Sequence, residues 1–132
     1  MSVRDEIENL FFRYARGFDE DDLDAMAGCF TEDARFFSGG WFHGREAIRE
    51  LLQERRRIRA QRGQLPRHVN TNIAIQPQGE DELRVHSYFS LVVSTRHGVA
   101  IDLAGTYEDT IVRENGRWLI ASRVIARDEF PA

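Results

Sequence analysis

The chain has 132 residues, a formal net charge of −4 at pH 7, and a composition of 42% hydrophobic and 30% charged residues. We expect residues 1–132 to form a single domain with a sizeable core. The negative charge argues against general nucleic-acid binding, and no apolar run approaches the roughly 20 residues of a membrane span. The N-terminal residues also lack the apolar core of a secretory signal. These features predict a cytoplasmic protein that binds neither nucleic acid nor membrane.

The single cysteine, Cys29, cannot form an internal disulfide, which also favours a reducing compartment. It lies in an apolar stretch, so we expect a buried small side chain rather than a nucleophile. The four histidines show no HExxH pattern, and cysteine spacing typical of a metal site is absent. A glycine-rich phosphate loop and a GxSxG elbow are absent too. We therefore expect chemistry by side chains alone, with no metal and no cofactor.

Residues 7–19 show the spacing of an amphipathic helix, because apolar side chains recur every three or four residues. Ser2 and Asp5 can form a capping box at its start, and Gly17 is the predicted end. Asp19 then falls just beyond the helix, where a solvated carboxylate is the default expectation and a position in a pocket is the alternative. The apolar face comprises Ile7, Leu10, Phe11, Tyr14 and Phe18.

The segment 20–44 predicts short elements separated by turns. Asp21 or Asp22 should cap a second helix through residues 23–27, since a carboxylate accepts the free N–H groups there. Residues 31–33 are predicted as a turn and residues 34–38 as a strand. Gly39-Gly40 then permits a tight reversal into residues 41–44.

Residues 45–62 predict a third helix with a buried stripe and an arginine-rich second half. Two interpretations of the arginines stay open. They can form a solvated face that complements the helix dipole, or an anion-binding patch for a phosphate-bearing part of a substrate. The stripe comprises Ile48, Leu51, Leu52 and Ile58, and the arginines are Arg55, Arg56, Arg57, Arg59 and Arg62.

The second half of the chain predicts long antiparallel strands, because apolar and polar residues alternate. The expected strands are 68–75, 83–95, 99–113 and 117–127, with Asn115-Gly116 as a hairpin turn. Helices followed by strands indicate the α+β class. We expect the helices to lie on the concave side of a curved sheet and to leave a blind apolar cavity between the layers.

Strict alternation on the first long strand places His68, Asn70, Asn72 and Ala74 on one face. The opposite face would then carry Val69, Thr71, Ile73 and Ile75. On the last strand, Arg123 lies among Leu119, Ala121 and Ile125, so if buried it needs a counter-charge or an anionic ligand. Asp109 and Asp128 are the candidate partners for a structural salt bridge.

Several segments together resemble the SnoaL-like branch of the nuclear transport factor 2-like superfamily. This resemblance implies a cone-shaped α+β barrel, with N-terminal helices packed on the concave face of a strongly curved, mainly antiparallel sheet. It extends over almost the whole chain in family order, and the segments are 12–19, 29–34, 44–48, 67–70, 105–109 and 116–123.

The resemblance also implies a site. Some dehydratases of this superfamily, including the bile-acid 7α-dehydratase type, use a pocket tyrosine, an aspartate five residues later, a strand histidine and a late-strand arginine. Tyr14, Asp19, His68 and Arg123 match these positions. Scytalone dehydratase also uses a second tyrosine and a second histidine, which have no assigned counterpart here. Plausible wall residues for substrate are Phe36, Trp41 and Tyr107.

The function implied is a cofactor-independent lyase or isomerase of the dehydratase type. Its substrate would be a small, apolar, oxygenated molecule, either polycyclic or like a polyketide or steroid. The alternative is a ligand-binding or assembly subunit that resembles the β subunit of ring-hydroxylating dioxygenases. An epoxide hydrolase ranks last, because it needs more pocket acids than the sequence offers. By resemblance, we expect a homodimer or homotrimer.

Overall fold

The computed structural model describes residues 1–129 and has three helices and six strands. All six strands form one sheet in the order β2-β1-β6-β5-β4-β3. The pair β1/β6 is parallel and the other pairs are antiparallel. The elements are α1 (Val3–Asp19), α2 (Leu23–Ala27), β1 (Phe30–Phe37), β2 (Trp41–His43), α3 (Arg45–Gln61), β3 (Leu65–Pro77), β4 (Glu82–Thr95), β5 (Gly98–Glu114) and β6 (Arg117–Arg127).

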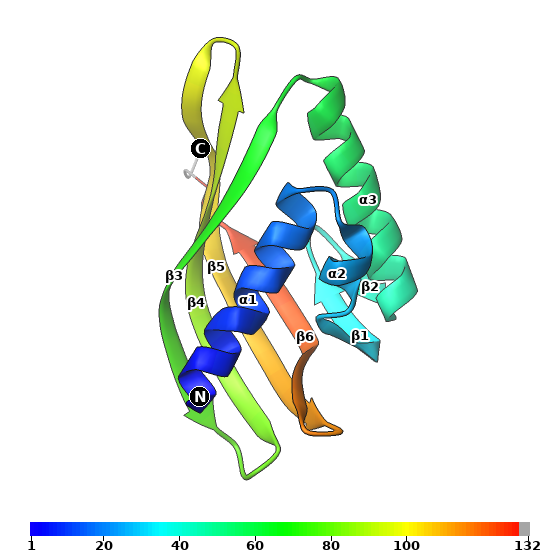
Figure 1. Cartoon of the computed structure of the whole chain (residues 1–132), viewed down its shortest axis with the longest axis vertical. Helices are drawn as coiled ribbons and strands as arrows, with labels where there is room; N and C mark the ends of the chain where they lie inside the picture. The colour runs from blue at the N-terminus through cyan, green and yellow to red at the C-terminus, as the bar shows by residue number, and fades with distance from the viewer. Residues whose placement is uncertain (130–132) are drawn as a thin grey trace.

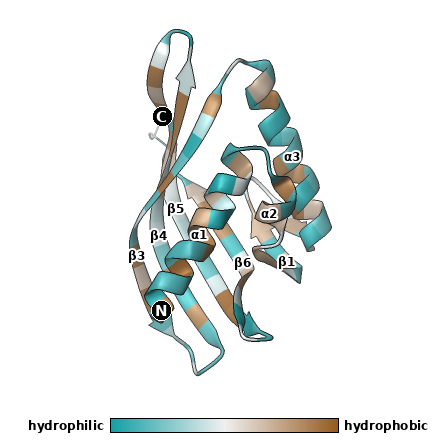
Figure 2. Ribbon diagram, in the orientation of Figure 1, coloured by the Kyte–Doolittle hydropathy of each residue, from teal (hydrophilic) through white to brown (hydrophobic). Residues whose placement is uncertain are grey.

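The three helices lie on one side of the curved, unclosed sheet, with α1 running obliquely across the strands (Figure 1). The predicted α+β class, with helices over a curved and mainly antiparallel sheet, is confirmed. Apolar residues gather where the layers meet, while the outward side of α3 and the hairpin tips are hydrophilic (Figure 2). No helix within residues 1–129 is long and apolar enough to cross a membrane.

Helix α1 begins as predicted and ends later than predicted. Ser2 and Asp5 form the capping box, with both hydrogen bonds present. The helix continues past Gly17 to Asp19. Gly17 instead permits a close approach of α2, because a Cβ atom built there would lie 2.7 Å from the backbone nitrogen of Met26. The predicted helix end at Gly17 was therefore wrong. A glycine is needed at this position because a side chain would prevent the close packing of α1 against α2.

Strand β1 is longer than predicted. It starts at Phe30, so the turn predicted for residues 31–33 was wrong. The register against β6 shifts between Phe30 and Arg35, and Glu32 and Asp33 are exposed at this irregularity. At a bulge, consecutive strand residues can both carry solvent-exposed polar side chains. In the sequence, such a run of polar residues looks like a turn. The reversal after β1 and the cap of α2 by Asp22 follow the prediction.

Strand β3 contains a bulge that changes which face its residues occupy. The register with β4 shifts between Thr71 and Ala74, and Asn72 has a positive φ of 55°. Asparagine tolerates this left-handed conformation better than most residues. His68 and Asn70 therefore share the inward side with Ile73 and Ile75, while Asn72 and Ala74 are exposed. The strict alternation that we predicted along this strand was wrong for the second half.

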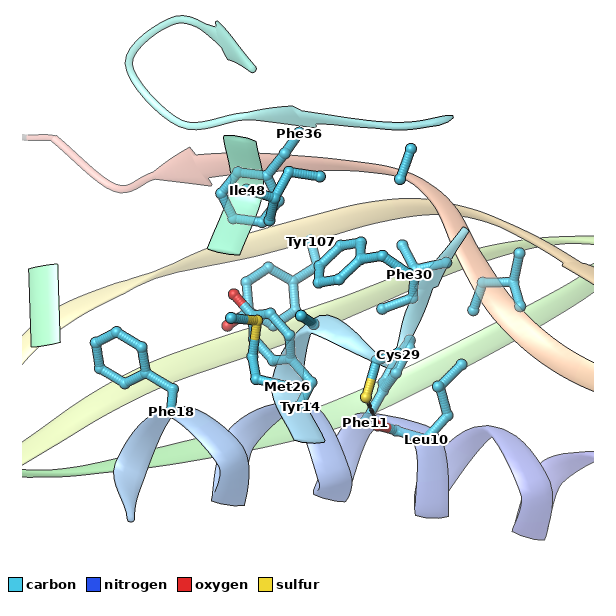
Figure 3. Packing of buried hydrophobic residues seen from close by; sticks show 14 of the residues in the cluster. Leu10, Phe11, Tyr14, Phe18, Met26, Cys29, Phe30, Phe36, Ile48 and Tyr107 are labelled. Atoms are coloured by element: carbon cyan, nitrogen blue, oxygen red, sulfur yellow. Dashed lines mark hydrogen bonds between the residues drawn. The ribbon is translucent and has the colours of Figure 1, made fainter. Parts of the chain in front are cut away.

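The core is continuous from α1 to the sheet. Cys29 is buried in it, as predicted, with its sulfur 3.5 Å from the carbonyl oxygen of Ala25. Burial also raises the pKa of this thiol. Tyr14 and Tyr107 lie in the middle of the cluster, with Phe18 toward one side and Phe30 toward the other (Figure 3).

Candidate active site

A cavity of about 360 Å³ opens between the helices and the concave side of the sheet. One wall comes from α3, another from β4, β5 and β6, and the end of α1 meets β3 at the deeper part. The lining is mixed, with aromatic and aliphatic side chains beside a group of arginines. The lining residues are Tyr14, Phe18, Ser38, Leu52, Arg55, Ile58, Arg59, Arg62, His68, Phe89, Leu91, Asp102, Leu103, Tyr107, Ile125 and Arg127.

Asp19 and His68 form a hydrogen-bonded pair at this cavity. Nδ1 of His68 lies 2.7 Å from Oδ1 of Asp19, and the backbone N–H of His68 donates to Oδ2 over 2.8 Å. The two side chains are 6% and 12% exposed. The default expectation of a solvated Asp19 was wrong. Because an ionised carboxylate only accepts hydrogen bonds, Nδ1 carries the proton in neutral His68 and Nε2 is left as the basic nitrogen.

Arg56 helps to hold Asp19 at the end of α1. Its guanidinium donates to the carbonyl oxygens of Phe18 and Asp19 over 3.0 and 3.1 Å. These carbonyl groups belong to the last turn of α1, where the regular helical hydrogen bonds end. The Phe18 carbonyl oxygen also accepts from the backbone N–H of Asp21 over 3.2 Å, and the cation from α3 adds to this contact. Phe18 also packs its ring edge-on to the His68 imidazole, with centroids 5.2 Å apart. Residues of α1, α3 and β3 therefore hold the Asp19–His68 pair, called the dyad below, in place.

Two tyrosines line the cavity beside the dyad. Tyr14 packs edge-on to both His68 and Tyr107, at centroid separations of 6.0 and 6.1 Å. Burial raises the pKa of Tyr14, and it raises the pKa of Tyr107 well above its ordinary value. The positive charge of Arg123 opposes both shifts without reversing them. Both phenols are therefore protonated at neutral pH and able to donate a hydrogen bond.

Arg123 lies beneath the two tyrosines and does not line the cavity. It forms a bidentate ion pair with Asp109, at 2.7 and 2.9 Å, and neither side chain is exposed to solvent. Of the two predicted partners, Asp109 is the one found. The Arg123 guanidinium also lies 4.4 Å from the centre of the Tyr14 ring and 3.9 Å from that of Tyr107. Its Nη1 is buried without a hydrogen-bond partner among the described residues.

The ion pair affects the two partners differently. Burial raises the pKa of the Asp109 carboxyl, and the adjacent Arg123 offsets this shift in part. Burial alone would lower the pKa of Arg123, but the attraction of Asp109 outweighs it and raises the pKa. Arg123 therefore remains a cation, and its charge acts on the cavity through the aromatic rings above it.

Two of the three predicted wall residues lie elsewhere. Tyr107 lines the cavity, as described above. Phe36 is fully buried in the core and contacts Phe30. Trp41 is 45% exposed on the short edge strand β2, with the guanidinium of Arg35 over its ring. The predicted placement of Phe36 and Trp41 at the cavity was therefore wrong. The sequence around an aromatic residue in a short strand does not show whether its side chain will line a cavity, pack in the core or lie at the edge of the sheet.

The arginines of α3 divide between structure and cavity. Arg57 pairs with Glu54 on the outer face, as a solvated helix end predicts. Arg56 caps α1. Arg55, Arg59 and Arg62 turn to the cavity, where Arg55 donates to the hydroxyl of Ser38 over 2.6 Å. Of the two interpretations left open, the solvated face describes Arg57 but not Arg55, Arg56 and Arg59, which are half-buried.

Sequence reasoning also missed several cavity residues. Phe89, Leu91, Leu103 and Ile125 come from three strands and meet only because the sheet curves. Their inward positions could have been found from strand alternation, but their position at a cavity could not. Arg56 could have been found only from its proximity to the end of α1.

The comparisons with known proteins agree with this geometry. The SnoaL-like domain family matches residues 1–124. A structure of a variant of Rv3472, a protein of unknown function from Mycobacterium tuberculosis, is 31% identical with a TM-score of 0.83, covering 95% of this chain and 71% of that one. No curated protein matches the chain.

Two further solved structures come from Novosphingobium aromaticivorans. A protein provisionally named scytalone dehydratase is 24% identical, with a TM-score of 0.80 and coverage of 96% and 84% of the two chains. The β subunit of a provisionally named aromatic-ring-hydroxylating dioxygenase is 17% identical, with a TM-score of 0.73 and coverage of 96% and 90%. At these identities the likeness shows the fold alone.

The fold defines a cone-shaped α+β protein with an open cavity on the concave side of its sheet. The family match then makes the assignment specific. The chain belongs to the SnoaL-like domain family.

Proposed function

We propose that the protein is a cofactor-independent lyase or isomerase of the dehydratase type. The observation that carries the proposal is the 2.7 Å hydrogen bond between Asp19 and His68 at the wall of a cavity that is partly apolar. An imidazole oriented by a carboxylate is a general base whose tautomer and direction are already set.

His68 would act first as the base. Its Nε2 takes a proton from the carbon next to a substrate carbonyl, and the electron pair of that C–H bond forms the enolate. Asp19 stabilises the resulting imidazolium. In dehydration, the enolate electrons form the new C=C bond while the C–O bond to the β-hydroxyl breaks. The proton on Nε2 passes to the leaving hydroxyl, which departs as water; in isomerisation, the proton returns to another carbon.

Tyr14 and Tyr107 would stabilise the oxygen that gains negative charge. Their raised pKa values keep both phenols protonated, so each can donate a hydrogen bond to an enolate oxygen. Arg123 would strengthen this effect from below the rings without touching substrate. It acts as a positioning and electrostatic residue, which refines the catalytic role that the family resemblance suggests.

The cavity suits a compact, mostly apolar substrate. Its walls carry Phe18, Leu52, Phe89, Leu91 and Leu103, and its volume of about 360 Å³ is at the lower end of that of typical ligand pockets. A fused-ring compound of two or three rings with a carbonyl and a β-hydroxyl group matches these features. Such chemistry is consistent with the dehydratase-like neighbour and with the polyketide- or steroid-like substrates implied by the family.

Turnover by a His68→Ala variant tests the proposal. Wild type and variant are assayed on a panel of β-hydroxy ketones of steroid and polyketide type, with product followed by the absorbance of the new conjugated double bond. Loss of the base should reduce kcat by a factor of about 10²–10⁴. His86→Ala is the matched control, because His86 pairs with Glu108 and is 50% exposed. Turnover that survives His68→Ala, or that falls equally in His86→Ala, would exclude the dyad.

An assembly role is the second candidate, favoured by the exposed apolar side chains of the sheet. Tyr88 and Ile101 are 51% and 68% exposed on β4 and β5, and such residues can join copies or partner subunits. Affinity purification from the native host separates the two roles. A larger iron-containing subunit in the eluate supports an assembly subunit, whereas a homodimer or homotrimer alone supports the enzyme.

A further inference from the structure

The outer part of the cavity carries more positive charge than its own acids can neutralise. Four arginines line the cavity, from α3 and from the end of β6, and they face one acidic lining residue, Asp102. The arginines are Arg55, Arg59, Arg62 and Arg127.

Only one of the four is paired with that acid. Arg59 bonds Asp102 over 2.8 Å and also donates to Gln64. Among residues 1–129, Arg55, Arg62 and Arg127 form no ion pair with an acidic side chain. The other arginines of α3 do not line the cavity and all have partners, since Arg49 pairs with Asp24 and Arg57 with Glu54, while Arg45 and Arg56 donate to backbone carbonyl oxygens. Three arginines at the cavity thus carry a charge that no acidic side chain of residues 1–129 neutralises by direct contact.

Arg55 is held in place by hydrogen bonds to a residue beside the cavity. Two hydrogen bonds to the hydroxyl and carbonyl of Ser38, at 2.6 and 3.1 Å, hold its guanidinium at the cavity wall. Burial lowers the pKa of Arg55, and repulsion from Arg127 lowers it further. Two like charges therefore stand near each other in a partly desolvated place, an arrangement that an anion between them would relieve.

The distance from Tyr107 to Arg127 fits the length of one substrate molecule. Ile125 is opposite Tyr107 in the β5/β6 register, and Arg127 lies two residues further along β6. Two residues of strand span about 7 Å. A ring system that contacts Tyr107 can therefore extend an acidic group to Arg127.

We propose that the substrate carries an anionic group, a carboxylate or a phosphate ester, which Arg55, Arg62 and Arg127 bind at the mouth of the cavity. This inference rests on the proposed function, because it names the class of substrate for the same site. Guanidinium groups bind both anions by charge-assisted hydrogen bonds, so the shared requirement is a negative charge at the end of an apolar body.

Calorimetric binding of matched acids and amides tests the inference. The probes are 2-naphthoate and biphenyl-4-carboxylate, each against its uncharged carboxamide, and 2-naphthyl phosphate. Wild type should bind at least one acid about tenfold or more tightly than its amide at low salt, and the ratio should fall as salt rises. The better of 2-naphthoate and 2-naphthyl phosphate identifies the type of anion.

Variants locate the binding group. Arg62→Gln/Arg127→Gln should bring the acid-to-amide ratio close to one, while Arg57→Gln, on the outer face of the same helix, should leave it unchanged. An acid that binds no better than its amide, or a ratio that survives the double variant, overturns the inference. His68→Ala should keep the wild-type ratio. Retained acid binding alongside wild-type turnover of His68→Ala would therefore reject the enzyme proposal and leave the anion site standing.

Discussion

Residues 1–129 contain two buried pairs of a carboxylate with a basic side chain, and the pairs differ in what surrounds them. Asp19 and His68 join α1 to β3, and His68 lines the cavity. Asp109 and Arg123 lie opposite each other on the neighbouring strands β5 and β6, with both side chains at 0% exposure. Both pairs have short hydrogen bonds.

The difference separates the pair proposed for proton transfer from a structural charge pair. Histidine is a residue type that serves as a general acid or base, whereas a guanidinium does not release its proton in proteins. His68 lines the cavity, so under the proposed function the first pair can meet a substrate. Arg123 does not line the cavity, and its guanidinium instead lies against the rings of Tyr14 and Tyr107. Burial and hydrogen bonding are similar in the two pairs, so contact with the cavity is the feature that distinguishes them.

The largest expected effect comes from neutralising one acid in each pair. Asp109→Asn leaves the Arg123 charge buried and uncompensated, which should lower the free energy of unfolding by about 3–5 kcal/mol. Asp19→Asn leaves a neutral histidine and keeps an amide able to hydrogen-bond, so it should cost about 1 kcal/mol. Urea unfolding followed by tryptophan fluorescence measures both.

Equal losses in the two variants would contradict the distinction. If Asp109→Asn does not fold, the double variant Asp109→Leu/Arg123→Met replaces the whole pair by apolar side chains and should recover much of the stability. Failure of the double variant to improve on Asp109→Asn would show that the buried cation is not the source of the loss.

A smaller loss of stability is expected at the contact between α1 and α2. This contact lies in the last turn of α1, just before Asp19. Gly17→Ala should destabilise the protein by about 1–3 kcal/mol, because the new methyl group would overlap the backbone of Met26. Helix propensity alone predicts the opposite sign, since alanine is favoured over glycine. Gly28→Ala is the control, as its Cβ would find ordinary contacts at 3.4 Å or more. A Gly17→Ala protein as stable as wild type in urea would refute the packing role.

The smallest effect concerns the aromatic layer between the two pairs. Burial raises the pKa values of Tyr14 and Tyr107, so above about pH 10 the folded protein holds more protons than the unfolded chain. Their contribution to stability is thus complete below pH 10 and is lost as the pH rises through the folded-state values.

Unfolding midpoints at pH 9, 10 and 11 measure this loss. It should reach at most about 1.4 kcal/mol per pH unit for each tyrosine. Tyr14→Phe or Tyr107→Phe should make the decline shallower, and Tyr88→Phe, at a 51% exposed site, should not. An unchanged slope in the first two variants would count against the buried phenols as the cause.

Local patterns in the sequence predicted most of the elements, because they depend on spacing. The apolar period of α1, the alternation in β4, β5 and β6, and the Asn115-Gly116 turn all gave the observed structures. Gly17 was misread because its reason is the nearby backbone of Met26, which no local window contains. The β3 bulge was not predicted for a similar reason. It is defined by the pairing of β3 with β4, and the sequence of β3 alone does not show that one residue is extra.

The candidate site was predictable only in part. Tyr14, Asp19 and His68 were named from a family pattern, and their burial together depends on the curve of the sheet and on Arg56 at the end of α1. Arg123 was correctly given Asp109 as a candidate counter-charge, but its depth below the tyrosines could not be inferred from alternation. Phe36 and Trp41 were placed at the cavity on residue type alone, and type does not determine depth.

The extra residue in β3 has a consequence for how this scaffold can change. The bulge at Asn72 lets one strand place both His68 at the cavity and Ile73 against the hydrophobic core, although the two residues are an odd number of positions apart. Loss of the bulge at constant strand length would turn either His68 or Ile73 outward, because the two residues are five positions apart. Deletion of the extra residue would instead leave both on the inward face, since they would then be four positions apart. The left-handed geometry at Asn72 is therefore the feature that sequence changes along this strand should keep when its length is unchanged.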